Sequence, residues 1–227
     1  MLSHWHRAIT VIGVVPTVIL LSLAHSSRAQ TPENITVTAI MGQAYYSTNA
    51  EYWRALRAGD SMRLGDVVHA GPDSAVELFL GVDAGYLRVT ENSQLTLEDY
   101  VVNEVYKQSD LRLILTEGAV VGFSNHVAST SDYKIKMSHG VVGVAASQFR
   151  VDASGFFVCL DGALDFTRPG DDGLLKTEIM KAPPACYYTP NTGVRLAPYA
   201  LVQEVLGQST GELPKASKRK KKTRTSL

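Results

Sequence analysis

Short stretches in which apolar and polar residues alternate recur along most of the chain. Val76–Leu80, Leu111–Leu115 and Tyr133–Met137 are clear cases, with an apolar side chain at every second position. Such alternation places one side of a strand in a core and the other toward solvent. Seventeen of the 18 glycines follow residue 41, a spacing typical of short strands joined by tight turns. The pattern predicts one all-β domain over residues 34–182.

Only two segments have helical character. Ala50–Ala58 has room for one or two turns, with Trp53 and Leu56 facing inward. Pro198–Leu206 is the better candidate, because proline suits a first helical turn, an apolar stripe follows it, and Gly207 can cap its end.

The region after the predicted domain has a different composition. Pro183, Pro184 and Pro190 interrupt the strand pattern before the predicted helix. We therefore expect residues 183–214 to form a proline-containing extension with one short helix.

The N-terminus has the features of an export signal. Arg7 precedes an apolar run, Ile9–Ala24, that is short for a bilayer span, and Ser27-Arg28-Ala29 places small residues at the −3 and −1 positions of a cleavage point. We expect residues 1–29 to be a signal peptide cleaved near Ala29. The alternative is an uncleaved N-terminal anchor. In both cases the rest of the chain is exported, and the expected location is periplasmic or secreted.

The balanced composition, 22 basic against 22 acidic residues, hides an uneven distribution of charge. Residues 1–29 carry +2, residues 30–214 carry −9 and residues 215–227 carry +7. The last segment has no apolar periodicity and is expected to be a disordered basic tail. Its charges are Lys215, Lys218, Arg219, Lys220, Lys221, Lys222 and Arg224. The tail is either simply solvated or attracted to an anionic surface of the envelope; no specific nucleic-acid partner is expected.

A series of short motifs resembles the FecR domain, in the order in which that family has them. They are Leu64–Leu78, Gly81–Val89, Asn92–Leu97, Leu115–Val120, Ile135–Val151 and Cys159–Leu164. The resemblance implies an all-β fold, either a sandwich or a rolled, solenoid-like stack of short antiparallel strands, and a buried Trp53. The chain departs from the family at Ala145-Ala146-Ser147, where FecR domains usually have Arg-Gly-Thr. The missing glycine puts a special turn at this point in doubt.

The resemblance also bears on function. Classical FecR proteins look like transmembrane regulators, in which a cytoplasmic helical segment handles a sigma factor and a periplasmic part senses a transporter. Here about eight residues precede the apolar run, too few for a sigma-binding segment. The chain is therefore more similar to the stand-alone exported FecR modules.

The chain has two cysteines, and both lie in the exported part. Because that compartment is oxidising, Cys159 and Cys186 are candidates for a disulfide, and a buried free thiol at Cys159 is the alternative. His69, His126 and His139 have no compact metal-ligand spacing, so no metal site is expected from them.

Other candidate chemistry is weak. Calcium held by Asp171 and Asp172 in a turn stays open as an alternative. There is no Gly-x-Ser-x-Gly elbow, so no catalytic residue is assigned, and no cofactor is expected.

Adjacent tyrosines are the candidate binding residues. Tyr45 and Tyr46, like Tyr187 and Tyr188, must each place one ring outward if the chain is extended there. The preferred hypothesis is an exported, non-enzymatic FecR-like binding or assembly module of the cell envelope, with an envelope protein or glycan as its partner. The alternatives are an envelope signalling component that relays to a membrane regulator or sigma-factor system and, third, an enzyme acting on envelope glycan.

Overall fold

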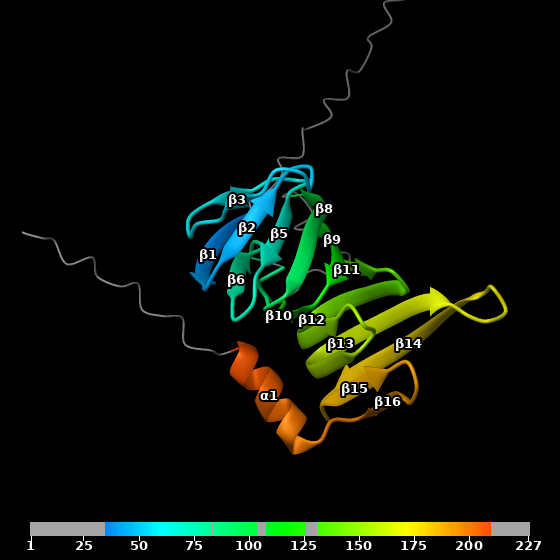
Figure 1. Cartoon of the computed structure of the whole chain (residues 1–227). Helices are drawn as coiled ribbons and strands as arrows, with labels where there is room; N and C mark the ends of the chain where they lie inside the picture. Colours follow the sequence, from blue (N-terminus) through cyan, green and yellow to red (C-terminus); the bar gives the residue numbers. More distant parts are fainter. Residues whose placement is uncertain (1–34, 83, 104–107, 126–130, 210–227) are drawn as a thin grey trace, which may run out of the picture.

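The computed structural model describes residues 35–82, 84–103, 108–125 and 131–209. Their sixteen strands form one mixed sheet, with a single helix near the C-terminus, so the predicted all-β class is confirmed (Figure 1). The strands are β1 (Ile35–Met41), β2 (Ala44–Ser47), β3 (Arg54–Ala55), β4 (Ser61–Met62), β5 (Val67–Ala70), β6 (Ala75–Phe79), β7 (Tyr86–Val89), β8 (Ser93–Asn103), β9 (Gln108–Glu117), β10 (Ala119–Phe123), β11 (Asp132–Met137), β12 (Gly140–Asp152), β13 (Phe157–Pro169), β14 (Leu175–Ala182), β15 (Cys186–Thr189) and β16 (Gly193–Leu196). The helix is α1 (Tyr199–Ser209).

The sheet is strongly curled. Its main path runs β3-β2-β5-β8-β9-β11-β12-β10-β7-β6-β1-β4, and every pair is antiparallel except β9 with β11. At one end of this path the Leu56 N–H donates to the Ala44 carbonyl beside β3, and at the other end the Val37 N–H donates to the Asp60 carbonyl beside β4. Residues 56–60, which connect β3 to β4, join the two ends. β13 leaves the path at β12 and carries β14 and β15 on its other edge.

The alternating pattern fills the inside of this curl. In β9 the side chains of Leu111, Leu113 and Leu115 are buried, whereas Arg112 between them is exposed. The same rule holds through β11, and the inward side chains of both halves of the sheet form one continuous hydrophobic core. Full burial of one such leucine contributes roughly 1.5–3 kcal/mol.

β12 lies in the middle of the path, β13 pairs along its other edge, and the two strands bend together. The register of the pair shifts between Ala145 and Gln148, and at this bulge Ala146 has φ 40°. On the facing strand Gly162 has φ 75°, and a Cβ there would lie 1.9 Å from the Ala146 carbonyl oxygen. The bend therefore keeps its special backbone although the family's usual glycine is absent, with alanine in the left-handed region that favours glycine. Ser147 fixes it by donating to the Asp161 carbonyl at 2.8 Å.

The segment after residue 182 is part of the same sheet, not a separate extension. β15 pairs with β13 and β16 pairs with β15, two strands that the proline-rich sequence conceals. The predicted helix is present as α1, and it continues through Gly207 instead of ending there.

α1 covers part of the outer face of the sheet. Val205 is buried against Val121 of β10 and Val158 of β13. Arg150 of β12 donates to the Gln208 side chain at 2.5 Å and lies 3.8 Å from the Glu204 carboxylate. The helix is thus fixed by an apolar contact and by polar ties to the sheet (Figure 1).

The helical turns expected over Ala50–Ala58 are absent. The Asn49 side chain accepts from the Glu51 N–H at 3.1 Å, and Ala50 has φ 60°, so the chain turns there instead of starting a helix. Leu56 is buried as expected, but Trp53 is 40% exposed, and its expected burial in the core is therefore wrong.

Candidate functional site

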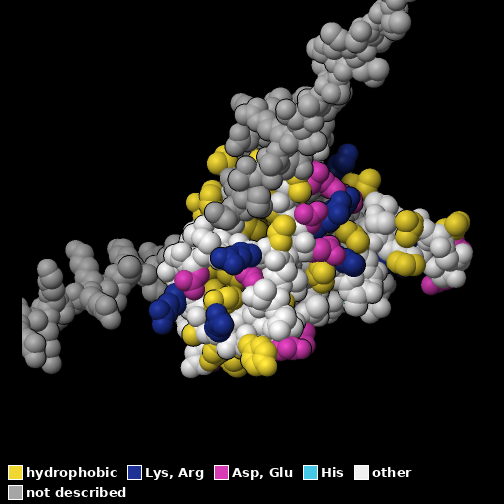
Figure 2. Space-filling model, turned by 90° about the horizontal axis from the view of Figure 1, so that it is seen from above, with side chains coloured by type: hydrophobic (Ala, Val, Ile, Leu, Met, Phe, Trp, Pro, Cys, Tyr) yellow, Lys and Arg dark blue, Asp and Glu magenta, His cyan; other side chains and the backbone are white. Residues whose placement is uncertain are grey.

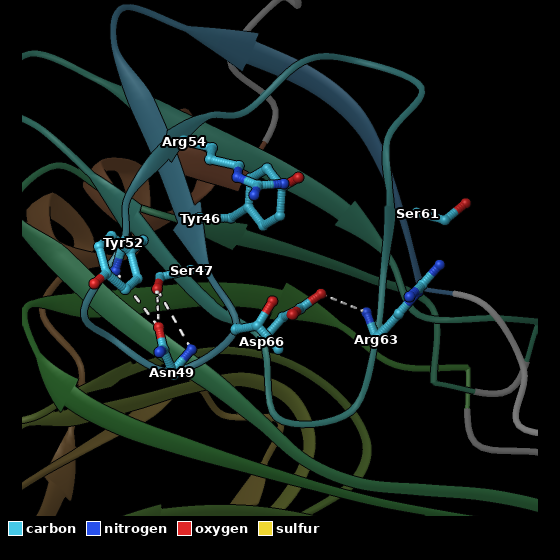
Figure 3. Close-up of a pocket in the computed structure, with 9 residues that line it drawn as sticks. Tyr46, Ser47, Asn49, Tyr52, Arg54, Ser61, Arg63 and Asp66 are labelled. Atoms are coloured by element: carbon cyan, nitrogen blue, oxygen red, sulfur yellow. Dashed lines mark hydrogen bonds between the residues drawn. The ribbon is translucent and has the colours of Figure 1, made fainter.

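A cleft of about 480 Å³ opens where the two ends of the curled sheet meet (Figure 3). β2, β3 and β4 contribute its walls, together with the loops on either side of them. The lining residues are Tyr46, Ser47, Thr48, Asn49, Tyr52, Arg54, Ser61, Arg63 and Asp66. This volume falls within the range of small-molecule sites in proteins.

Two turns of the same construction flank β4. In Arg57–Asp60 and in Arg63–Asp66 the aspartate side chain accepts from the arginine N–H, at 2.9 and 2.8 Å, and the aspartate N–H returns a bond to the arginine carbonyl. The third residue of each turn is a glycine with positive φ. The second turn places Asp66 at the base of the cleft and Arg63 on its wall (Figure 3).

The opposite wall is the loop between β2 and β3. The Asn49 amide oxygen accepts from the Ser47 hydroxyl at 3.3 Å and from the Glu51 N–H at 3.1 Å. These bonds hold the loop in a tight curve, and the exposed side chain of Tyr52 lies beside Ser47 and Asn49 on this wall (Figure 3). Tyr46 stands on β2, with its ring partly buried against the core.

The cleft is lined by arginine and tyrosine side chains, with one buried aspartate at its base. Arg54 and Arg63 are exposed, and neither has a carboxylate within ion-pair distance among the residues described. Asp66 is 3% exposed, and its Oδ1 atom has no hydrogen-bond partner in the described structure. A buried oxygen without a donor is rare in folded proteins, and the exposed guanidinium groups suit the cleft to a ligand that brings an anionic group to its rim.

Tyr45 lies on the other side of β2, as alternation in a strand requires. With Trp53, His69 and Gln94 it lines a shallow groove of about 420 Å³ on the convex face. The Trp53 and His69 rings meet edge to face, with centroids 5.8 Å apart. The adjacent tyrosines of β2 therefore reach two different surfaces.

The second tyrosine pair does not form a surface site. Tyr188 is 2% exposed and stacks on Phe157, with ring centroids 5.4 Å apart, so its assignment as a contact residue is wrong. Tyr187 is partly buried and packs beside Phe156 and the apolar contact of α1. Core covers one face of β15 and the helix covers the other.

Cys159 and Cys186 are direct partners in the pairing of β13 with β15. Both are buried, and both are unbridged thiols in the structure. Burial raises the pKa of the Cys159 thiol to about 11, and burial also raises the pKa of Cys186. Directly opposed residues of antiparallel strands have Cα separations of about 4.5–5.5 Å, within the range of disulfides. The bridge stays a prediction that this register permits.

The remaining candidates are dispersed. Within the described ranges no three histidine, cysteine, aspartate or glutamate side chains come together as metal ligands, and His126 lies outside those ranges. Asp172 accepts from the Leu174 N–H in the β13–β14 turn. The signal segment 1–29 and the basic tail 215–227 also lie outside the described residues. In the described part of the chain no helix is long and apolar enough to span a membrane.

The sequence pattern does not mark two features of the surface. Arg54 and Arg63 lie in a two-residue strand and a turn, and these elements are too short to show a periodic pattern of apolar residues. The exposed rings of Tyr86 and Phe123, with Phe79 beside them, form an aromatic row across three strands. These residues are far apart in sequence, and only the strand register aligns them.

The fold defines the class of the molecule first: an all-β module built on one curled mixed sheet. Among known protein families, the model described as FecR protein matches residues 66–164. The chain therefore contains a FecR domain, as the motifs indicated. None of the curated proteins matches the chain.

The FecR family is associated with the cell envelope and with signalling and regulation, and it is not known as a family of enzymes. Asp66 is the first matched residue, so every other residue that lines the cleft precedes the matched region. The cleft is therefore built between the first motif of the domain and a segment that the family model does not cover.

Proposed function

We propose that this chain is an exported, non-enzymatic binding module of the cell envelope, and that it holds its ligand in the cleft lined by Tyr46, Arg54, Arg63 and Asp66. The observation that carries the proposal is the combination of two exposed guanidinium groups with a buried, unpartnered carboxylate oxygen. That combination supports recognition of a ligand and offers no nucleophile with an adjacent base.

The ligand class follows from the groups in the cleft. A guanidinium binds a carboxylate or phosphate through two parallel hydrogen bonds. The rings of Tyr46 and Tyr52 offer an apolar body with a polar tip, which suits a sugar ring carrying hydroxyl groups. We therefore expect an acidic glycan. The attraction of an acidic ligand must come from the arginines of the cleft itself, because residues 30–214 as a whole carry a charge of −9.

Titration calorimetry with a uronic-acid oligosaccharide tests the assignment, with its neutral counterpart as the second probe. The Arg54→Ala/Arg63→Ala double variant should bind the acidic probe at least about tenfold more weakly, because each lost charged hydrogen bond is worth roughly 1.5–3 kcal/mol. Arg195→Ala is the matched control, since Arg195 is an exposed arginine on β16, outside the cleft. Equal binding by the double variant and the control would reject the cleft as the site.

Signal relay is a second candidate, favoured by the association of the FecR family with envelope signalling. In that case the cleft would receive the signal and a membrane regulator would read it. A relay predicts that the Arg54→Ala/Arg63→Ala variant alters transcription under an envelope-responsive sigma factor. A simple binding module predicts loss of ligand with unchanged transcription.

The basic tail, residues 215–227, supports attachment to an anionic surface as a separate element. Its seven positive charges should make retention on envelope material sensitive to salt, because exposed charges are screened within about 10 Å at 0.1 M. Deletion of residues 215–227 should reduce retention at low salt while glycan binding in the cleft stays unchanged. Unchanged retention at low salt would remove the tail from this role.

A further inference from the structure

The β13–β14 hairpin projects from the body of the molecule and ends in an open sheet edge (Figure 1). Among the described strands β14 pairs only with β13, so its other edge is unpaired. Leu175 is 74% exposed and Ile179 is 60% exposed. Figure 2 shows hydrophobic side chains gathered on this projecting lobe, at the right of the view. An exposed edge strand with apolar side chains is a template for pairing with another chain.

The two faces of β14 differ in chemistry. Because successive side chains of a strand point to opposite faces, Leu175, Thr177 and Ile179 share one face. Lys176 and Glu178 share the other face. Both faces are symmetric about Thr177: Leu175 and Ile179 lie two residues from it, and Lys176 and Glu178 lie one residue from it.

We propose that β14 pairs antiparallel with β14 of a second copy of this chain, about a twofold axis at Thr177. In this register Leu175 lies opposite Ile179 of the second copy, and Lys176 lies opposite Glu178 of the second copy. Thr177 meets its own equivalent. The Leu175–Ile179 contact and the Lys176–Glu178 ion pair each form twice, as an isologous interface requires.

The charges select this register over its neighbours. A twofold axis normal to a continuous sheet must pass through a residue pair, so the neighbouring registers are centred on adjacent residues. Centring the pair on residue 176 would place Lys176 against Lys176, and centring it on residue 178 would place Glu178 against Glu178. Like charges directly opposite destabilise strand pairing, whereas opposite charges stabilise it.

The contact is small, because it joins two single strands and their side chains. Interfaces below about 1,200 Å² are typical of weak, transient association. The fraction of dimer should therefore rise with protein concentration. A high local concentration at a surface would favour the dimer. The dimer would carry two clefts, and a ligand made of repeating units would bind to both clefts more tightly than to a single cleft. The pairing itself does not depend on the proposed ligand and is tested without it.

Charge reversal tests the register. Sedimentation of the full chain at low salt, over increasing concentration, should show a monomer–dimer equilibrium. Lys176→Glu and Glu178→Lys should each weaken the dimer about tenfold or more, since each turns two attractive pairs into repulsive ones. The double variant Lys176→Glu/Glu178→Lys restores both pairs and should recover dimerisation. A chain that stays monomeric at every concentration, or a dimer indifferent to the single reversals, would overturn the proposal.

Disulfide trapping tests the same register independently of charge. The Thr177→Cys variant places a thiol opposite its own equivalent, with Cβ atoms about 4.5–5.5 Å apart, close enough to bridge under a mild oxidant. The Ile179→Cys variant is the matched control, because it lies on the same exposed face but opposite Leu175 of the second copy. Covalent dimer should form at least ten times faster with Thr177→Cys. Equal rates for the two variants, or no covalent dimer from either, would contradict the pairing.

Discussion

The two tyrosine pairs of this chain have nearly the same local sequence and opposite environments. Tyr45-Tyr46 lies in the strand Ala44–Ser47, and Tyr187-Tyr188 lies in the strand Cys186–Thr189. In β2 one ring lines the cleft and the other lines the convex groove. In β15 one ring is in the core and the other is packed near α1. The difference teaches that a strand's pattern shows which residues face apart, but not what later segments will cover.

The largest expected contrast is in stability. Tyr188→Ala removes a fully buried ring between Phe157 and Phe166 and should lower the free energy of unfolding by about 3–5 kcal/mol. Tyr46→Ala removes a ring that is only partly buried, and the cost should stay near 1 kcal/mol. Chemical denaturation of both variants measures the difference. Equal losses would mean that the two strands are not differently buried.

A bridge between Cys159 and Cys186 would sharpen the contrast, because it would fasten β15 to β13 beside Tyr187. Closing this loop stabilises by about 3.5 kcal/mol in the chain-entropy model. Reductant should then lower the free energy of unfolding by that amount, and the mass of the native protein should rise by two hydrogens on reduction. Two alkylatable thiols in the native, unreduced protein would show that the strands are held by packing alone.

In the reduced protein the same pair should make the stability of this region depend on pH. The pKa of Cys159 is raised from its ordinary value of 9.0 to about 11 by burial. Since the folded state holds the proton more tightly, its contribution is complete below pH 9 and is lost as the pH rises toward 11. Unfolding measured from pH 8 to 11 should show a steeper loss for the wild type than for Cys159→Ala. Parallel curves would contradict burial of the thiol.

The smallest effect concerns the outer face of β15. Tyr187→Ala removes a partly buried ring next to α1 and should cost about 1–2 kcal/mol, with faster amide exchange in the helix. The Tyr45→Ala variant, which alters the open groove, should leave amide exchange in the helix unchanged. Unchanged exchange in the Tyr187→Ala variant would show that the ring does not support the helix.

Much of the fold could be predicted from the sequence, because alternation and glycine spacing report on strands directly. The helix after Pro198 was also predictable from its proline and its apolar stripe. The strands Cys186–Thr189 and Gly193–Leu196 were not, because prolines nearby suggested a break. Cys186–Thr189 pairs with a strand that lies about 30 residues earlier, and Gly193–Leu196 pairs only with Cys186–Thr189. The exposure of Trp53 could not be foreseen either, since it depends on a tight turn at Asn49 and Ala50.

The candidate site was predictable only in part. Tyr46 was identified as a binding residue, but Arg54 and Arg63 were not, because their short elements carry no period. The family motif around Asp66 was recognised, yet the motif alone does not show that one carboxylate oxygen fixes a turn and the other is buried without a partner at the base of a cleft. Ser93 has a similar structural part in its motif: it is fully buried, and its hydroxyl accepts from the Ala119 N–H at 2.8 Å. These motif residues thus stabilise turns, whereas the cleft depends on the segment before residue 66, which supplies its other lining residues.

Mapping backbone amide shifts by NMR while a uronic-acid oligosaccharide is added tests the central claim most directly. The cleft predicts that the largest changes fall on two separate segments, Tyr46–Arg54 and Ser61–Asp66, with little change at His69 and Gln94 on the convex groove. Changes centred on His69 and Gln94, or no changes at saturating ligand, would contradict it.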